Sequence, residues 1–434
     1  MKLRPFEIVM IVVFGGMLIL SLILLSTFEP KPEEGTVDLG GTISIWGTLP
    51  AVTVDGILRG LSEENDGFRA VTYRHIQPED FDREFVDALA DQVPPDLLLV
   101  SHERLVKHRN RLQPIPYDLF PERDFRTSYI DGAAIFALSD GLYGLPIAVD
   151  PIVMYWNRDM FSTNGFLTPP TTWEEIVSDT VPKLTERDFN RVIQRSAIAM
   201  GEYSNVKNAF PVISMLMIQG GSALVTEKNS KYKISLNDSF SSTVKNPFTS
   251  AMTFYTNFSN VNNTLYSWNR TLDLDRDMFL REDLASYFGY GSEGRDIEIK
   301  NPNLSFDIAE VPQGASATVK RTYGKFYGLM IPRAAKNQNG AFTVMQTLGS
   351  VENTKILSDS YNMAPVYRNS LQVGSNDFYG RVIYQSAFNA RGWLNPDMDR
   401  VGPVFTKVLE DVSSNRKDAA SAVNDASVRL QQIY

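Results

Sequence analysis

Residues 141–176 read GLYGLPIAVDPIVMYWNRDMFSTNGFLTPPTTWEEI. Val, Ile, Tyr and Trp are frequent across residues 142–157, which is typical of β-strands, but Pro146 and Pro151 interrupt the run. The pattern therefore predicts two short extended segments rather than one central strand. Because the proline at 151 disfavours helical geometry in the residue before it, Asp150 is predicted to lie where the chain crosses between two lobes.

A helix is predicted to begin after the Pro-Pro pair at residues 169–170. Residues 171–175 read TTWEE and follow a Pro-Pro pair. A Thr hydroxyl at the start of a helix can accept a hydrogen bond from a free backbone N–H, and a Glu three residues later can bind back to the cap. This spacing indicates a capping box.

Other segments follow the pattern of an α/β fold. Residues 80–92 carry apolar side chains at helical spacing, and residues 97–100 (LLLV) are typical of a buried parallel strand. An apolar helix is predicted over residues 209–219, and residues 403–412 and 417–433 are predicted to form two amphipathic helices. Helix followed by a short loop and an apolar strand is the repeat of α/β lobes.

Four pieces of the chain also carry a family resemblance: YGLP at 143–146, IAVD at 147–150, MYWNRD at 154–159 and PPTTWEEI at 169–176. In this order and spacing they resemble the extracytoplasmic solute-binding proteins of ABC importers, specifically the maltose-binding-protein-like carbohydrate receptors. The resemblance implies an α/β fold of two lobes around a hinge cleft. It also implies a carbohydrate ligand, ABC importer permease subunits as partners, no cofactor and no enzymatic activity, in a chain expected to be a monomer.

The resemblance extends from about residue 42 to the end and predicts the domain boundaries. Lobe 1 is expected to comprise residues 42–150 plus 312–352. Lobe 2 is expected to comprise residues 151–311 plus 353–434.

The N-terminus predicts a membrane anchor. Residues 8–25 (IVMIVVFGGMLILSLILL) are almost wholly apolar, and at about 1.5 Å per residue they would span about 27 Å, close to the hydrocarbon thickness of a bilayer. Basic residues precede the span and acidic residues follow it, so the N-terminus is expected in the cytoplasm and the body outside. Residues 1–28 are therefore expected to form a cytoplasmic tip and transmembrane anchor, and residues 29–41 a linker. A cleaved signal peptide is the alternative.

Composition excludes several functions. The net charge of −9 argues against a nucleic-acid partner. The chain has no cysteine, which excludes disulfides, thiol nucleophiles and Cys-based metal sites. Its three histidines are interpreted as surface or capping residues rather than metal ligands: His75, His102 and His108.

Sugars offer hydroxyls at the ring edge and C–H groups on the ring faces, so carboxylates, amides and aromatic rings are expected to bind them. Asp150 is the expected hydroxyl acceptor, although it could instead bind backbone N–H groups. The predicted stacking residues are Trp46, Tyr155, Tyr290 and Trp393. Tyr155 could equally be strand core, and Trp393 a surface turn. A further polar contact is predicted from Glu202, Tyr203 and Asn205.

Residues 289–294 (GYGSEG) formally fit a dinucleotide-binding GxGxxG turn. That function requires a helix to open at the turn, and residues 295–302 (RDIEIKNP) alternate in character, so no helix and no dinucleotide site are predicted. The resemblance implies instead a glycine loop that presents Tyr290 to the sugar.

Two other functions remain open at this stage. A tethered glycan sensor or adhesin would bind sugar without transport. A glycoside hydrolase would need two carboxylates at roughly 5–10 Å, and the chain has 51 acidic residues from which such a pair could come.

Overall fold

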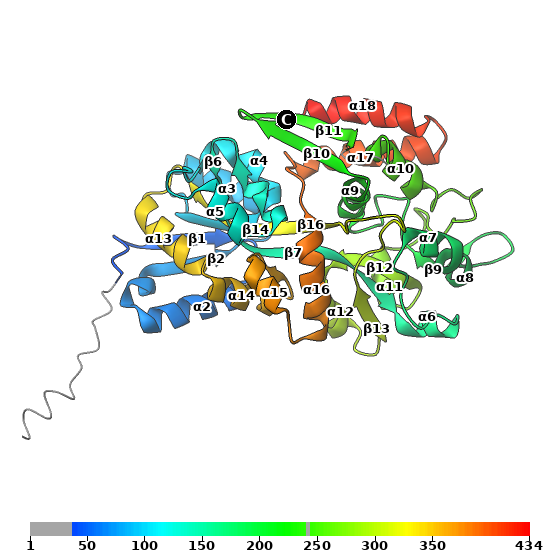
Figure 1. The fold of residues 1–434 in the computed structure, drawn as a ribbon, viewed down its shortest axis with the longest axis horizontal. Helices are drawn as coiled ribbons and strands as arrows, with labels where there is room; N and C mark the ends of the chain where they lie inside the picture. The colour runs from blue at the N-terminus through cyan, green and yellow to red at the C-terminus, as the bar shows by residue number, and fades with distance from the viewer. Residues whose placement is uncertain (1–36, 240–243) are drawn as a thin grey trace, which may run out of the picture.

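A computed structural model describes residues 37–239 and 244–434. In this part of the chain one sheet of 12 strands runs through the whole molecule, with the path β2-β1-β3-β14-β7-β12-β9-β8. Figure 1 shows two lobes side by side, joined by strands β7 and β14 near the centre. The expected two-lobed α/β fold is confirmed.

The principal strands are β1 (Ile43–Gly47), β2 (Val71–His75), β3 (Leu97–Ser101), β7 (Leu145–Asn157), β8 (Glu186–Arg187), β9 (Ile193–Ile198), β10 (Ser222–Lys228), β11 (Lys231–Ser239), β12 (Leu284–Tyr290), β13 (Phe306–Ala309), β14 (Thr322–Pro332), β15 (Ala364–Pro365) and β16 (Ala390–Arg391). The principal helices are α2 (Ala51–Glu64), α3 (Phe81–Ala90), α4 (Leu105–His108), α5 (Glu122–Ser128), α6 (Arg158–Thr163), α7 (Trp173–Glu175), α8 (Val181–Leu184), α9 (Ala209–Gln219), α10 (Pro247–Thr256), α11 (Asp275–Leu280), α12 (Gly294–Lys300), α13 (Gln338–Leu348), α14 (Val351–Ser360), α15 (Arg368–Val373), α16 (Phe378–Asn389), α17 (Met398–Ser413) and α18 (Ala419–Gln431).

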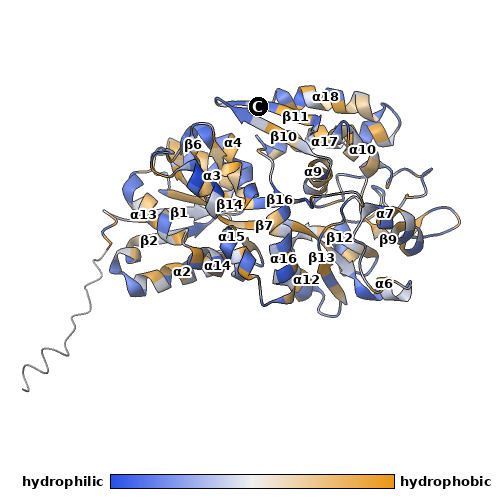
Figure 2. Ribbon diagram, in the orientation of Figure 1, coloured by the Kyte–Doolittle hydropathy of each residue, from blue (hydrophilic) through white to orange (hydrophobic). Residues whose placement is uncertain are grey.

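Strand β7 is one continuous strand of 13 residues, buried along its whole length, so the prediction of two short segments was wrong. Pro151 is tolerated because it lies where β7 changes neighbours: β15 pairs with Val149, and β12 pairs from Ile152 onward. A missing N–H at such a junction removes little of either ladder. Figure 2 shows β7 mostly in hydrophobic colours, as expected for a strand covered on both faces.

Along residues 37–239 and 244–434 the chain crosses between the lobes three times. After β7, strand β14 returns: its Gly324 pairs with Pro151 at the crossing and its Met330 pairs with Leu98 in lobe 1. The third crossing is near β16, which pairs with the start of β14. Several chain crossings between the same two lobes are expected to limit their relative motion to hinge bending.

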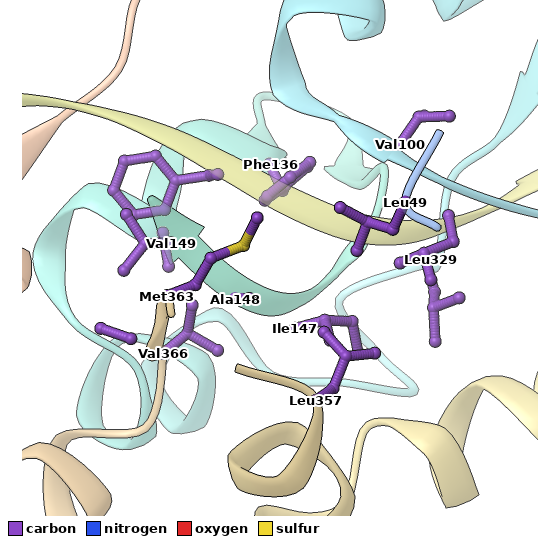
Figure 3. Close-up of a cluster of buried hydrophobic side chains, with 14 of the residues drawn as sticks. Leu49, Val100, Phe136, Ile147, Ala148, Val149, Leu329, Leu357, Met363 and Val366 are labelled. Atoms are coloured by element: carbon purple, nitrogen blue, oxygen red, sulfur yellow. The ribbon is translucent and has the colours of Figure 1, made fainter. Parts of the chain in front are cut away.

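The segment after residue 352 stays with lobe 1 longer than the sequence predicted. Helix α14 packs against α2, and α15 packs against α5. Figure 3 shows Met363 and Val366 in one buried cluster with Ala148 and Val149 of β7. The return to lobe 2 therefore comes near residue 390 rather than at 353, because the apolar side chains between these positions complete the lobe 1 core.

The expected helices form largely where their apolar spacing placed them. The apolar helix α9 has the predicted bounds and is followed by Gly221, whose φ of 84° is the left-handed conformation expected of a glycine after a helix end. Helices α17 and α18 pack against each other and against α10, and Figure 1 shows them covering the outside of lobe 2.

The capping box at the start of α7 is present as predicted. The Thr172 hydroxyl accepts a hydrogen bond from the Glu175 N–H at 3.2 Å, and the Glu175 carboxylate accepts one from the Thr172 N–H at 3.2 Å. From this cap a continuous helical segment runs through α7, a π-helical turn and α8 to Leu184.

Replacing Thr172 by alanine is expected to lower the free energy of unfolding by about 1 kcal/mol, because the Glu175 N–H loses its acceptor. Urea denaturation of the variant would measure this loss. Thr168→Ala, an exposed threonine four residues before the cap, is the matched control and is expected to match the wild type. Equal stability of the two variants would contradict the role of the cap.

A hairpin of lobe 2 also contacts lobe 1 through side chains, away from the crossing strands. Hairpin β10–β11 carries Glu227, whose carboxylate lies 3.3 Å from the buried guanidinium of Arg109 and accepts a hydrogen bond from the Ser139 hydroxyl at 2.8 Å. Arg109 also pairs with Asp140 of its own lobe at 2.8 Å. These contacts join the lobes outside the crossing strands.

The predicted membrane anchor, residues 8–25, lies outside the described residues. Over residues 37–239 and 244–434 no helix combines the length and the apolar character that crossing a bilayer requires.

Candidate ligand-binding site

Strand ends from both lobes meet at the crossing. The last residue of β3, Ser101, pairs with Tyr327 of β14, and the last residue of β12, Tyr290, pairs with Ile152 of β7. Both carboxyl ends therefore lie within two residues of the place where Lys325 of β14 pairs with Asp150 of β7. Ligands of α/β sheets bind in the crevice outside the carboxyl ends of strands. The polar residues at these ends are therefore the candidate site.

Asp150 is the buried carboxyl group of this site, with 3% of its surface exposed. It accepts hydrogen bonds from the Ser292 N–H at 3.1 Å and from the Ser292 hydroxyl at 2.5 Å. Burial raises the pKa of Asp150 to about 7, although the bonds from Ser292 act in the opposite direction. Asp150 thus fixes the turn after β12, which links the hinge to lobe 2.

Lys325 stands opposite Asp150 in the β7–β14 register. Its ammonium nitrogen lies 4.5 Å from the centre of the Tyr290 ring and 3.6 Å from Oε2 of Glu103. Desolvation lowers the pKa of Lys325, but Glu103 and other acidic neighbours outweigh it, and the pKa lies above its usual value. The lysine is therefore charged at neutral pH and brings an acid of lobe 1 and a ring of lobe 2 together.

Glu103 follows β3 and is held by hydroxyl groups. Tyr323 donates to its Oε1 at 3.2 Å and Ser101 to its Oε2 at 3.3 Å. Burial would raise the pKa of Glu103, but Lys325 and the other polar neighbours hold it below its usual value. The carboxylate is ionised and oriented.

The turn that presents Tyr290 rests on a second buried acid, Glu293. Its carboxylate accepts hydrogen bonds from the Tyr290 N–H at 3.1 Å and the Tyr287 hydroxyl at 2.8 Å. Lys207 pairs with it at 2.8 Å. Desolvation opposes ionisation of Glu293, yet these partners keep its pKa below the usual value. Asp150 and Glu293 therefore hold this turn from two sides.

The GxGxxG turn at 289–294 does open a helix, α12, so the prediction of a non-helical continuation was wrong. The helix has seven residues. In the turn before it the Ser292 N–H is bound to Asp150, so this donor serves a carboxylate of the protein where a dinucleotide site would need it for a phosphate. The expectation that this is no dinucleotide site stands.

Residues 64–379 match the family model of bacterial extracellular solute-binding proteins. The chain belongs to this family. A binding protein of Brucella abortus (strain 2308) is 24% identical to this solute-binding protein over 338 residues, which are 74% of this chain and 73% of the relative. The prediction that the chain is not an enzyme is confirmed, since the family consists of solute-binding proteins.

Solved structures share the fold. A cyclo/maltodextrin-binding protein complexed with maltotetraose superposes with a TM-score of 0.72 at 16% identity and covers 92% of this chain and 98% of its own. The sugar-binding protein MalE of Xanthomonas citri gives a TM-score of 0.70 at 17% identity, covering 90% and 97%. The maltose-binding periplasmic protein MalE of Listeria monocytogenes in complex with maltose gives 0.69 at 16%, again covering 90% and 97%.

Two of the predicted ligand residues, Asp150 and Tyr290, lie in the interlobe site of this solute-binding protein. Asp150 bonds the backbone and hydroxyl of Ser292, which is the alternative role considered for it. The Tyr290 ring is mostly buried, and Lys325 stands over it.

Tyr155 and Trp393 do not fit the predicted stacking role. Tyr155 is fully buried and its hydroxyl donates to the Tyr290 carbonyl at 2.7 Å. Trp393 packs against Phe210 at 5.1 Å between ring centres and donates to the Tyr434 hydroxyl at 2.9 Å. Both rings lie inside lobe 2, because their apolar faces fill its core.

Trp46 lies on β1, and the guanidinium carbon of Arg74 lies 4.6 Å from the centre of the Trp46 ring. Arg74 in turn pairs with Glu84 of α3 at 2.6 Å. The structure therefore places Trp46 beside the β2 and α3 elements of lobe 1.

The polar group at 202–205 mainly supports lobe 2. Asn205 donates to the carbonyls of Asn269 and Leu272 at 2.9 and 3.0 Å, so it holds a loop. Glu202 pairs with Arg270 at 3.4 Å. Tyr203 lies half-buried against Gly402 of α17.

Glu103, Lys325, Ser292 and Glu293 were missed. Glu103 could have been found as the acid two residues after the end of a buried parallel strand. Lys325 could have been found as a lone cation in an otherwise apolar strand pattern. The remaining two become site residues only through contacts made across the fold.

Two of the three histidines, which were expected to be surface or capping residues, are buried. His102 lies beside Gly392 and burial lowers its pKa to about 4. His108 bonds Asp82 at 2.9 Å. Over the described ranges, no group of three or more His, Cys, Asp and Glu side chains is arranged to hold a metal ion.

Proposed function

We propose that this solute-binding protein captures a carbohydrate between its two lobes and delivers it to the permease subunits of an ABC importer. The observation that carries the proposal is the interlobe cluster of Glu103, Lys325, Asp150 and Tyr290. It offers acceptors, a donor and an aromatic ring at one place, which is the chemistry that sugar edges and faces require. Proteins of the same fold were crystallised with maltotetraose and with maltose.

An apolar hollow of about 360 Å³ in lobe 2 is a less suitable site for a sugar than the interlobe cluster. Its lining includes Trp173, Leu216 and Phe254. A sugar bound there would bury hydroxyls with few partners, which costs free energy. The interlobe cluster is the better site because its polar groups are fixed before a ligand arrives.

We further propose that the segment 8–25 anchors the protein in the membrane, with the N-terminus in the cytoplasm and the two lobes outside as a monomer. Such a tether would keep the receptor near its permease. Membrane fractionation of the full chain and of a chain lacking residues 1–36 tests this part. Equal recovery of both in the soluble fraction would contradict the anchor.

Isothermal titration of the full-length protein in detergent micelles tests the ligand. The titrants are maltose, maltotetraose, mannotriose and tagatose, with chromatography of the sugar afterwards. We expect binding of at least one sugar, at one site per chain, with the sugar recovered unchanged. Binding of a phosphate ester, polyamine or peptide, and of no sugar, would overturn the carbohydrate assignment.

Measuring sugar uptake by cells distinguishes an importer receptor from a glycan sensor or adhesin. A strain lacking the gene is expected to lose uptake of the sugar that binds. Normal uptake in that strain would favour a sensor.

A further inference from the structure

The ammonium group of Lys325 has N–H groups that are not used in hydrogen bonds to the described part of the protein. Its nearest carboxylate oxygen, Oε2 of Glu103, lies 3.6 Å away, which is longer than the roughly 2.7–3.2 Å of an N–H···O hydrogen bond. Within the described residues the ammonium group donates no hydrogen bond to another protein group. Its side chain is 25% exposed, so the lysine is not closed off from solvent.

The partner acid is held in place from behind. Tyr323 and Ser101 donate to the two oxygens of Glu103 at 3.2 and 3.3 Å. On its other side Lys325 rests on the Tyr290 ring, an attractive cation–π contact at 4.5 Å. The Glu103 carboxylate and the Lys325 ammonium group are therefore each held in place by other residues and do not depend on each other for their positions.

A hydroxyl group is suited to this gap. It accepts from an ammonium group and donates to a carboxylate at once, and both bonds are charge-assisted and thus among the stronger ones. An ether oxygen can only accept, and a deoxy carbon can do neither. The two charges also compensate each other, so the pair favours an uncharged ligand over an acid or an amine.

We propose that Lys325 is a specificity-determining residue of the site, whose ammonium group donates to one sugar hydroxyl that in turn donates to Glu103. This inference rests on the proposed function, because it takes the ligand to be a sugar. It narrows the ligand class to neutral sugars with a free hydroxyl at the position that meets the pair.

Binding of maltose, maltotetraose, mannotriose and tagatose is measured for full-length wild type, Lys325→Met, Lys325→Arg and Lys320→Met. The last variant is the matched control: Lys320 lies five residues earlier, with a 59% exposed side chain paired to Glu310. We expect Lys325→Met to weaken binding by about 10- to 100-fold, the range of a hydrogen bond to a charged group. Lys325→Arg is expected to restore part of this loss, and Lys320→Met to bind as the wild type.

A second measurement identifies the hydroxyl. Monodeoxy derivatives of the tightest-binding of these four sugars are titrated into wild type, Lys325→Met and Glu103→Gln. One deoxy position is expected to cost the wild type about 10- to 100-fold in affinity. At that position the loss is expected to fall several-fold in either variant, which a purely structural role of the two residues would not produce.

The outcomes separate this inference from the proposed function. If sugars bind the wild type and Lys325→Met binds them equally well, the role of Lys325 is wrong and the receptor function stands. If none of the four sugars binds, both fail. Thermal denaturation checks that Lys325→Met folds, and if it does not, the deoxy series with Glu103→Gln decides: unchanged discrimination there would overturn the inference.

Discussion

Trp393→Ala is expected to lower the free energy of unfolding by about 3–5 kcal/mol, the range measured for large aromatic side chains removed from a core. Trp393 is 1% exposed. Its ring contacts Phe210 and Phe405 with centre distances of 5.1 and 5.8 Å. Alanine would leave a cavity between α9 and α17 and would also leave the Tyr434 hydroxyl without the donor it now has.

Chemical denaturation of both Trp393→Ala and Trp46→Ala measures the difference. Trp46 is half-buried under Arg74, so its loss is expected to cost less than that of Trp393. The sugar affinity of Trp393→Ala, measured well below its unfolding transition, is expected to stay close to that of the wild type. A variant of normal stability that has lost sugar binding would restore the stacking role predicted from the sequence.

Asp150→Asn is expected to change the pH dependence of stability. Burial raises the pKa of Asp150 to about 7, whereas an aspartate in an unfolded chain titrates near 4. Between these values the unfolded chain releases a proton that the folded protein keeps, so stability falls as pH rises, by about 1.4 kcal/mol per pH unit. Below pH about 4 and above about 7 this group contributes no slope.

Urea denaturation of ligand-free wild type and Asp150→Asn at intervals from pH 4 to 8 measures the effect. The asparagine cannot ionise and can still bond Ser292. The free energy of unfolding of the variant is therefore expected to lose this part of its pH dependence. Relative to the wild type, the variant is expected to become more stable as pH rises. Asp275 is a second buried acid whose pKa burial raises to about 7, and Asp275→Asn is the matched comparison. Parallel profiles of wild type and Asp150→Asn would contradict the raised pKa.

Much of the fold could be predicted because its signals are local. Apolar spacing predicted α9 and the pair α17 and α18, and the TTWEE motif predicted the cap of α7. Two local inferences went wrong because contacts with distant parts of the chain outweighed the local signal. Pro151 seemed to end a strand and RDIEIK seemed non-helical, but a change of neighbouring strands accommodates the proline, and the carboxylates of Asp150 and Glu293 hold the turn from which α12 begins.

The site was predicted in part. Asp150 and Tyr290 could be predicted because a crossing and a glycine turn mark their positions in the chain. Tyr155 and Trp393 could not be assigned, since an aromatic residue has the same local pattern in a core and in a cleft, and only packing against Phe279 or Phe210 decides which. Glu103 and Lys325 are 222 residues apart in the chain, and no local pattern shows that they meet.

The sequence by itself determined the fold class, the helices α3, α9, α17 and α18, the cap of α7 and the position of the first crossing, because these depend on periodicity, capping and turn chemistry over a few neighbouring residues. The family was indicated by the resemblance of four motifs in their order and spacing. Only the tertiary structure decided which polar groups form the site and where the chain finally leaves lobe 1. Contacts between β3, β7, β12 and β14 bring Glu103, Asp150, Tyr290 and Lys325 to one place, and burial there sets their charges. Neither the proximity nor the burial is encoded in any single stretch of the chain.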